Sequence, residues 1–334
     1  MSTATINTVT GPISPDDLGV TLMHEHLVIG FPGWDANTMI PRQSREEMVA
    51  VCVDKIAQLQ DRGVKSMLDP CPNDIGRDVE LAAEVSSRTG FQIICATGLY
   101  HEHMGGSGYW QFRAGFGKGA AEISELFITE LTKGVGDTGI KAGIIKVASG
   151  AGEITEYERT VLEAAAMASI ETGAPITTHT DEGTMGDEQQ RILTNLGVPS
   201  NRIIIGHSCG STDIGYHMKI AGGGSYLGFD RFGIDPLMSD ASRVAALLAL
   251  LKAGAEQYIV VSHDAVWCAK GDIVPSDVLE NLPFENIFNS NHFHDHIMPQ
   301  LLEGGATQDQ IDQLLIHNPR RFFSNEAPSF VAPG

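Results

Sequence analysis

Six side chains of this sequence have types that bind metal ions or move protons, and each lies at or just beyond the end of a short apolar run. They are His24, His26, Lys146, His179, His207 and Asp264. In a strand, residues i and i+2 point to the same face, so His24 and His26 would present two imidazoles side by side. Two neutral imidazoles on one face are the start of a divalent metal site. The spacing therefore predicts a metal centre.

Each of these residues also has an ordinary structural interpretation. The chain holds 12 histidines, so a chance His-x-His is expected, and the pattern recurs at 101–103 and 292–294. His179 suits a hydrogen-bonded core histidine, His207 a turn, and Asp264 a helix N-cap. The metal interpretation gains its weight from position, because all six residues fall at the ends of predicted strands.

Lys146 is a lone amine in an apolar run, with Ile144 and Ile145 before it and Val147 after it. Burial lowers the pKa of a lysine and leaves part of it neutral and nucleophilic. Such an amine could form a Schiff base, pair with a buried carboxylate, or capture carbon dioxide as a carbamate that bridges two metal ions. The nearby histidines favour the carbamate, since a Schiff-base site has no use for four imidazoles.

Eight short apolar runs alternate with helix-like segments and would position these side chains. The runs cover residues 19–24, 64–68, 91–96, 142–147, 175–178, 202–206, 225–229 and 258–262. Capping boxes at Ser44, Thr155 and Thr307 mark helix starts between and after them. Continuous apolar runs indicate strands buried on both faces, so we predict an α/β fold, a (β/α)8 TIM barrel, as one domain over 1–334. A doubly wound open sheet is the alternative, but the first βα turn lacks Gly-x-Gly-x-x-Gly.

Composition excludes several classes of partner. The chain of 334 residues carries 22 Lys plus Arg against 42 Asp plus Glu, a net charge of −20, so its overall field repels nucleic acids and anionic membranes. Five scattered cysteines, an odd number, fit neither a disulfide framework nor a thiolate zinc site. No apolar run approaches the length of a spanning helix, and the N-terminus lacks signal-peptide character. We expect a cytoplasmic protein.

Several motifs together carry a family resemblance. They are GVTLMHEH at 19–26, GIIK at 143–146, PITTHT at 175–180, IGH at 205–207, LGFDRFG at 227–233, SHD at 262–264 and NPRRFF at 318–323. The set resembles the phosphotriesterase family of the amidohydrolase superfamily, and most closely its phosphotriesterase-like lactonases. The resemblance covers nearly the whole chain.

The resemblance implies a binuclear site with two divalent metal ions, zinc first and cobalt, iron or manganese as alternatives. His24, His26 and Asp264 would bind the more buried ion, and His179 and His207 the more exposed one. Lys146, carboxylated by carbon dioxide, and a hydroxide would bridge the two. The hydroxide would attack a carbonyl carbon or phosphorus, with Asp264 as general base. Relatives are commonly homodimers, so we expect a homodimer by resemblance.

In the lactonases a tyrosine after the third strand and an arginine after the seventh face the substrate, and the matching positions are Tyr100 and Arg231. A structural tyrosine and an ion pair of Arg231 with Asp230 or Asp235 are the alternatives. The chain departs from the lactonases at 101–110, HEHMGGSGYW, where we expect a more polar and more mobile loop. That departure argues against a long acyl chain in the substrate.

Two further segments have unusual sequences near the C-terminal part of the barrel. The loop that starts at 267 and runs to 290 has an unusual sequence, and this region commonly shapes the leaving-group pocket in the family. The histidine cluster at 292–296 is expected to be a solvated or capping segment at the start of the eighth helix.

The expected function is hydrolysis of a lactone or related carboxylic ester by a metal-bridging hydroxide, with promiscuous phosphotriesterase activity. An organophosphate triesterase and a sugar or phosphosugar lactonase are the enzymatic alternatives. A barrel that keeps its metal ligands only for stability is the alternative of another class.

Overall fold

A nearly closed parallel barrel forms the centre of the molecule. The computed structural model describes residues 4–274, 278 and 289–328. Within them, eight strands form one sheet in the order β11-β10-β9-β8-β7-β6-β5-β3. Their bounds are β3 Val20–Leu22, β5 Val64–Asp69, β6 Gln92–Gly98, β7 Ile144–Lys146, β8 Ile176–Thr177, β9 Ile203–Ile205, β10 Tyr226–Phe229 and β11 Ile259–Val261. The amide of Met23 donates to Val261 O at 3.3 Å and joins the two ends of the sheet, which confirms the predicted (β/α)8 barrel.

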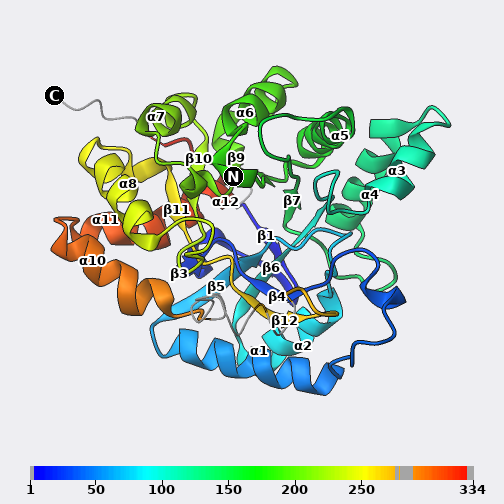
Figure 1. Cartoon of the computed structure of the whole chain (residues 1–334), viewed down its shortest axis with the longest axis horizontal. Coiled ribbons are helices and arrows are strands. Elements are labelled where there is room, and N and C mark those ends of the chain that lie inside the picture. Colours follow the sequence, from blue (N-terminus) through cyan, green and yellow to red (C-terminus); the bar gives the residue numbers. More distant parts are fainter. Residues whose placement is uncertain (1–3, 275–277, 279–288, 329–334) are drawn as a thin grey trace.

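Helices alternate with the strands and form an outer ring around them (Figure 1). They are α1 Arg45–Gln60, α2 Val79–Thr89, α4 Gly119–Thr132, α5 Glu156–Thr172, α6 Gly186–Asn195, α7 Ile214–Gly222 and α8 Asp240–Lys252. The capping boxes at Ser44 and Thr155 are present, and each places its helix start where the sequence predicted it. The apolar faces of these helices pack on strands that are buried on both sides, as in β7.

The C-terminal part of the chain closes the ring with shorter helical pieces. These are η7 Phe293–Ile297, α10 Met298–Glu303, α11 Gln308–Asp312, η8 Gln313–His317 and α12 Asn318–Ser324. The predicted capping box at Thr307 starts α11. The final helical segment extends beyond the expected end at His317, because α12 follows η8 directly.

The first barrel strand is interrupted, which the sequence did not predict. β3 ends at Leu22 and a second strand, β4, spans His26–Ile29. β4 pairs in parallel with β12 (Val266–Ala269), and β12 follows β11 after a short link, just as β4 follows β3. His24 therefore lies in a short link between β3 and β4, rather than on one continuous strand with His26. A hairpin of β1 (Ile6–Thr8) and β2 (Gly11–Ile13) also lies outside the predicted elements.

Two loop expectations need correction. Residues from 107 onward are not loop but helix α3 (Ser107–Ala114), and the preceding turn is held by Asp74, which accepts hydrogen bonds from the amides of Tyr100 at 3.0 Å and Gly106 at 2.8 Å. The cluster at 292–296 begins a helical segment as expected, with His292 as the N-cap residue of η7, but it is not wholly solvated, because His292 is buried and its Nε2 lies 2.6 Å from Asp240 Oδ2. Of the segment 267–290, residues 275–277 and 279–288 lie outside the described residues.

Two further findings bear on the environment of the protein. All five cysteines lie in the described part of the chain, where they are free and buried. Among the described helices, none has the length and apolar character needed to cross a bilayer.

Candidate metal centre

All eight residues singled out in the sequence line one cavity of about 170 Å³ at the C-terminal ends of the barrel strands. Its walls are His24, His26, Ile29, Phe31, Pro72, Ile75, Tyr100, Lys146, His179, His207, Arg231, Ile234, Asp264, Val266 and Ile273. The lining thus combines imidazoles, two cationic side chains and one carboxylate with apolar residues. The barrel thus gathers side chains that are far apart in the sequence, as the strand-end argument predicted.

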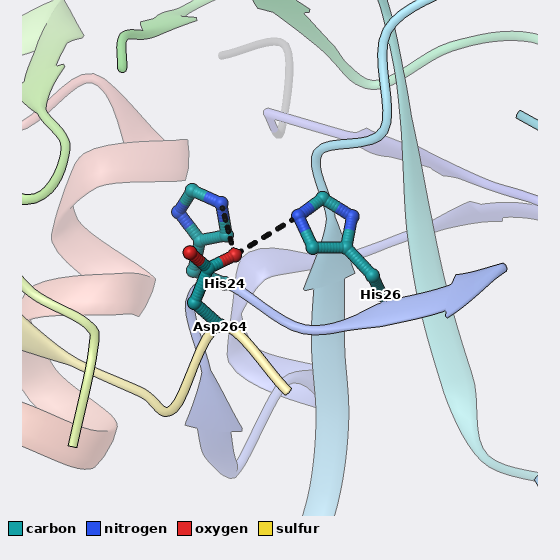
Figure 2. A group of neighbouring side chains, drawn as sticks. All are labelled: His24, His26 and Asp264. Atoms are coloured by element: carbon teal, nitrogen blue, oxygen red, sulfur yellow. Dashed lines mark ion pairs between the residues drawn. The ribbon is translucent and has the colours of Figure 1, made fainter. Parts of the chain in front are cut away.

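Asp264 is the point where the cluster converges. Its Oδ1 lies 3.4 Å from His24 Nε2 and 3.2 Å from His26 Nε2, and Figure 2 shows both imidazoles directed at this one oxygen. Its Oδ2 lies 3.8 Å from His207 Nε2 and accepts a hydrogen bond from Arg231 Nε at 2.9 Å. Asp264 has φ 56° and His207 has φ 58°, conformations that cost energy for residues other than glycine and that cluster at functional sites.

Two buried carboxylates hold three of the imidazoles from behind. Asp230 accepts from His24 Nδ1 at 3.1 Å and from His207 Nδ1 at 2.9 Å, and Asp69 accepts from His26 Nδ1 at 3.3 Å. Because an ionised carboxylate only accepts hydrogen bonds, each Nδ1 carries a proton, and the Nε2 of all three rings points into the cavity, with a free lone pair wherever the ring is neutral. Carboxylates behind imidazoles in this way orient and strengthen metal ligands.

Sequence reasoning missed the supporting role of Asp230 and Asp69. A signal was present, because Asp69 is the last residue of β5 and Asp230 directly follows β10, so both carboxylates lie at strand ends. Their partners lie on other strands, however, and the sequence does not show which imidazole each one meets.

The electrostatics favour neutral imidazoles and ionised carboxylates. Burial, assisted by Arg231, lowers the pKa of His207 well below its ordinary value, and burial lowers the pKa of His179 to about 3. Burial alone would raise the pKa of Asp264, but His207, His24 and Arg231 bring it well below the usual range. His26 is the exception, since hydrogen bonds to Asp264 and Asp69 outweigh burial and raise its pKa. Neutral nitrogens and anionic oxygens are the donors that divalent cations prefer.

Lys146 lies on the floor of the cavity with 1% of its surface exposed. Its Nζ donates to Thr178 O at 3.2 Å and lies 3.4 Å from His24 Nε2. Burial lowers its pKa to about 8. No carboxylate of the described residues lies within ion-pair distance of Nζ, so the structural alternative of a buried lysine–carboxylate pair is not what the fold forms. An amine that lines the cavity beside His24 and is partly neutral near pH 7 fits carbamate formation.

Tyr100 and Arg231 lie at the mouth of the cluster. The Tyr100 hydroxyl lies 3.2 Å from His179 Nδ1 and 3.4 Å from His179 Nε2, so the tyrosine faces the cluster. The nearest carboxylate oxygen to Arg231 is that of Asp264, at 2.9 Å, rather than Asp230 or Asp235 as the structural alternative required.

A (β/α)8 barrel with imidazoles, a carboxylate and a buried lysine at its C-terminal mouth defines the class of barrel metallohydrolases. Residues 4–323 match the model of the Phosphotriesterase family, so the chain belongs to that family. It is therefore a metal-dependent hydrolase that acts on ester bonds, and the family implies a binuclear centre of divalent metal ions.

Relatives agree with this placement over nearly full length. The chain is 32% identical to the aryldialkylphosphatase of Saccharolobus solfataricus, over 93% of this chain and 97% of that one. Among solved structures, the organophosphorus hydrolase from Deinococcus radiodurans superposes with a TM-score of 0.92 at 39% identity, covering 96% of this chain and 97% of that one. A structure titled "Molecular Engineering of Organophosphate Hydrolysis Activity from a Weak Promiscuous Lactonase Template" has a TM-score of 0.91 at 38% identity, with 96% and 99% coverage.

Proposed function

We propose that the enzyme opens a lactone or a related small carboxylic ester, with weaker activity toward phosphotriesters. The observation that carries this proposal is the cavity in which Tyr100 and Arg231 face the candidate metal ligands. At about 170 Å³ it is smaller than the 300–1,000 Å³ typical of drug-sized ligands, which favours a short substrate. The similar structure whose template is described as a weak promiscuous lactonase supports lactone opening.

The donor set supports two cation sites. His24, His26 and Asp264 would hold the inner ion, and His179 and His207 the outer one. Lys146, once carboxylated by carbon dioxide, would be a ligand of both ions. Oxygen and nitrogen donors without thiolate fit zinc, with cobalt, iron or manganese as alternatives. When bound, the two ions would lower the pKa of a water between them and polarise the electrophile.

Side chains of the protein would supply proton transfer, substrate orientation and exclusion of water. Asp264 would accept the proton released in the attack, as a general base fixed on the cavity floor. The Arg231 guanidinium, 2.9 Å from Asp264 Oδ2, would orient that carboxylate and the substrate. Tyr100 would donate a hydrogen bond to an oxygen of the ester. The apolar residues of the upper wall, Phe31, Ile234 and Ile273 among them, would exclude water from the acyl part.

A rate comparison on a substrate panel tests this proposal. The enzyme would be loaded with zinc or cobalt in the presence of bicarbonate and assayed on short and long acyl lactones, a sugar lactone and an activated aryl phosphotriester. We expect kcat/KM for a short lactone to exceed that for the phosphotriester by about a hundredfold, which is about 2.7 kcal/mol of differential transition-state stabilisation. A phosphotriester preference of that size would contradict the proposal.

An organophosphate triesterase is the second candidate function. It is favoured by the names of the relatives, an aryldialkylphosphatase and an organophosphorus hydrolase. A barrel with metal for stability only is the third, and a loss of turnover in Lys146→Ala with an intact fold would exclude it. A homodimer and a single domain over 1–334 stay predictions, which sedimentation and a single cooperative unfolding transition would test.

A further inference from the structure

His179 differs from the other three imidazoles of the cluster in how it is held. His24, His26 and His207 each donate Nδ1–H to a carboxylate of Asp69 or Asp230, whose side chains are 11% and 2% exposed. His179 instead meets its carboxylate, Asp181, through Nε2 at 2.6 Å. The side chain of Asp181 is 34% exposed, so this support comes from the rim of the barrel and not from its interior.

The contact with Asp181 decides which nitrogen of His179 is free. Because the carboxylate accepts the Nε2 proton, Nδ1 carries the lone pair. The Tyr100 hydroxyl, which lines the cavity, lies 3.2 Å from Nδ1 and 3.4 Å from Nε2, so the contact with Asp181 is the one that distinguishes the two nitrogens. The other three imidazoles present Nε2 to the cavity, whereas His179 presents Nδ1.

His101 lies behind this pair. It is 2% exposed, and neither of its ring nitrogens has a hydrogen-bond partner in the described part of the chain. Its ring stacks on His179, with centroids 5.6 Å apart and planes at 24°. Its Nε2 lies 3.9 Å from Asp181 Oδ2, the carboxylate oxygen that His179 does not use. A small rotation would turn this approach into a hydrogen bond that holds Asp181 against His179.

The backbone around Asp181 is fixed by close packing. The short helical turn Asp181–Gly183 lies on the loop at 208–210, and a Cβ on Gly183 would lie 2.5 Å from Ser211 N. The carbonyl of His179 accepts a hydrogen bond from Gln189 Nε2 at 2.8 Å. The Asp181 carboxylate is therefore presented to His179 from a defined position, despite its exposure.

We propose that Asp181, supported by His101, is a positioning residue that sets how tightly the outer metal ion is held. It does so by fixing the His179 ring with Nε2 protonated and Nδ1 directed into the cavity. The inference rests on the proposed function, because His179 must be a ligand of that ion.

One nitrogen or oxygen from each of His101, His179 and Asp181 lies within 4.8 Å of the others, so the same cluster could instead hold a third cation. The 2.6 Å contact argues against this, since it already occupies His179 Nε2 and Asp181 Oδ1.

Metal titration of the full chain tests the proposal. Metal-free protein would be titrated with zinc against a competing chelator, and bound zinc would be counted by mass spectrometry. In Asp181→Ala we expect the second zinc ion to bind about 10- to 100-fold more weakly, with the first unaffected. Glu182→Ala is the matched control, because it removes the next carboxylate of the same turn, which is exposed and should leave both affinities unchanged. The melting temperature of the metal-free protein should be the same in the wild type, in Asp181→Ala and in Glu182→Ala.

His101→Phe gives the second arm, because it keeps a stacked ring and removes both nitrogens. We expect it to weaken the second zinc ion several-fold, and this effect should vanish in the Asp181→Ala background if the two residues act as one unit. Equal zinc affinities in Asp181→Ala and Glu182→Ala would overturn the proposal. A drop from three bound ions to two in Asp181→Ala would also overturn it, in favour of a third cation site. A wild-type protein that binds fewer than two ions would overturn the proposed function itself, and this inference with it.

Discussion

The inner and outer halves of the candidate metal centre are built in different ways. The inner half, His24, His26 and Asp264, is part of the barrel seam, where backbone bonds join the two end strands. Asp264 N donates to His24 O at 3.0 Å, and His26 N donates to Ala265 O at 2.9 Å. The outer ligand His179 is held by side chains from loops at the rim, whereas the other outer ligand, His207, shares the buried carboxylate of Asp230 with His24. The seam leaves the inner ligands little freedom, whereas loop sequence can retune His179.

A buried pair inside the seam strengthens this contrast. Glu25, which lies between His24 and His26, accepts hydrogen bonds at Oε1 from His263 Nδ1 at 2.6 Å and from Ser262 Oγ at 2.8 Å. Both Glu25 and His263 are almost fully buried. The pair ties the segment that carries the two histidines to the segment that carries Asp264. No comparable pair supports His179 among the described residues.

The largest effect is expected at Asp264, which belongs to the inner half and to the chemistry. Asp264→Asn keeps the shape of the side chain but removes the charge that meets three imidazoles and Arg231. We expect kcat for the best lactone to fall about 10³-fold, as expected for loss of a general base that also binds metal. Asp272→Asn, an exposed carboxylate near the same mouth, is the control. A loss below tenfold would show that Asp264 is not the base.

The next effect concerns stability of the seam. Glu25→Gln leaves His263 and Ser262 facing a neutral amide in a fully buried place, and we expect the free energy of unfolding of the metal-free protein to fall by about 3 kcal/mol. Urea unfolding followed by circular dichroism measures it, with exposed Glu171→Gln as the control. If Glu25→Gln were as stable as the control, the seam would not depend on this pair, and the proposed contrast between the halves would fail.

The sequence predicted the barrel and the clustering of the candidate ligands better than their supports. Continuous apolar runs identify buried parallel strands, and the candidate ligands follow them directly, so their common position at one end of the barrel could be predicted without coordinates. Asp69, Asp230 and Asp181 could not be assigned, because their roles depend on which imidazole from another strand lies opposite. Helix α3 was missed for a different reason. It is short, it buries none of its residues, and it follows glycines at 105 and 106 and contains another at 108, a composition typical of a loop.

Lys146 lies between the two halves, and its carboxylation should depend on pH. Carbon dioxide reacts with the neutral amine, and the pKa of Lys146 is lowered from its ordinary value to about 8. Below pH 8 the neutral fraction rises about tenfold per pH unit, and above it the fraction levels off. At constant dissolved carbon dioxide, the initial rate of reactivation of metal-free enzyme should therefore rise about 50-fold from pH 6 to pH 8. A rate that still rises tenfold per unit above pH 9 would indicate an ordinary lysine pKa.

The smallest effect is expected in the outer half, at Tyr100. A Tyr100 variant tests whether this side chain contributes to substrate specificity or to the metal centre. Tyr100→Phe keeps the ring beside Phe31, with centroids 6.5 Å apart in the native protein, and removes only the hydroxyl that lies 3.2 Å from His179 Nδ1 and 3.4 Å from His179 Nε2. Loss of one such hydrogen bond is worth about 1 kcal/mol, so kcat/KM for a lactone should fall about fivefold. A phosphotriester should lose less than twofold, if the hydroxyl acts on the ester of a lactone as we propose. Tyr109→Phe, on the exposed face of α3, is the control and should change neither rate. Equal losses for both substrates would mean that the hydroxyl supports the metal ligand rather than the ester, and the outer half would then resemble the inner one.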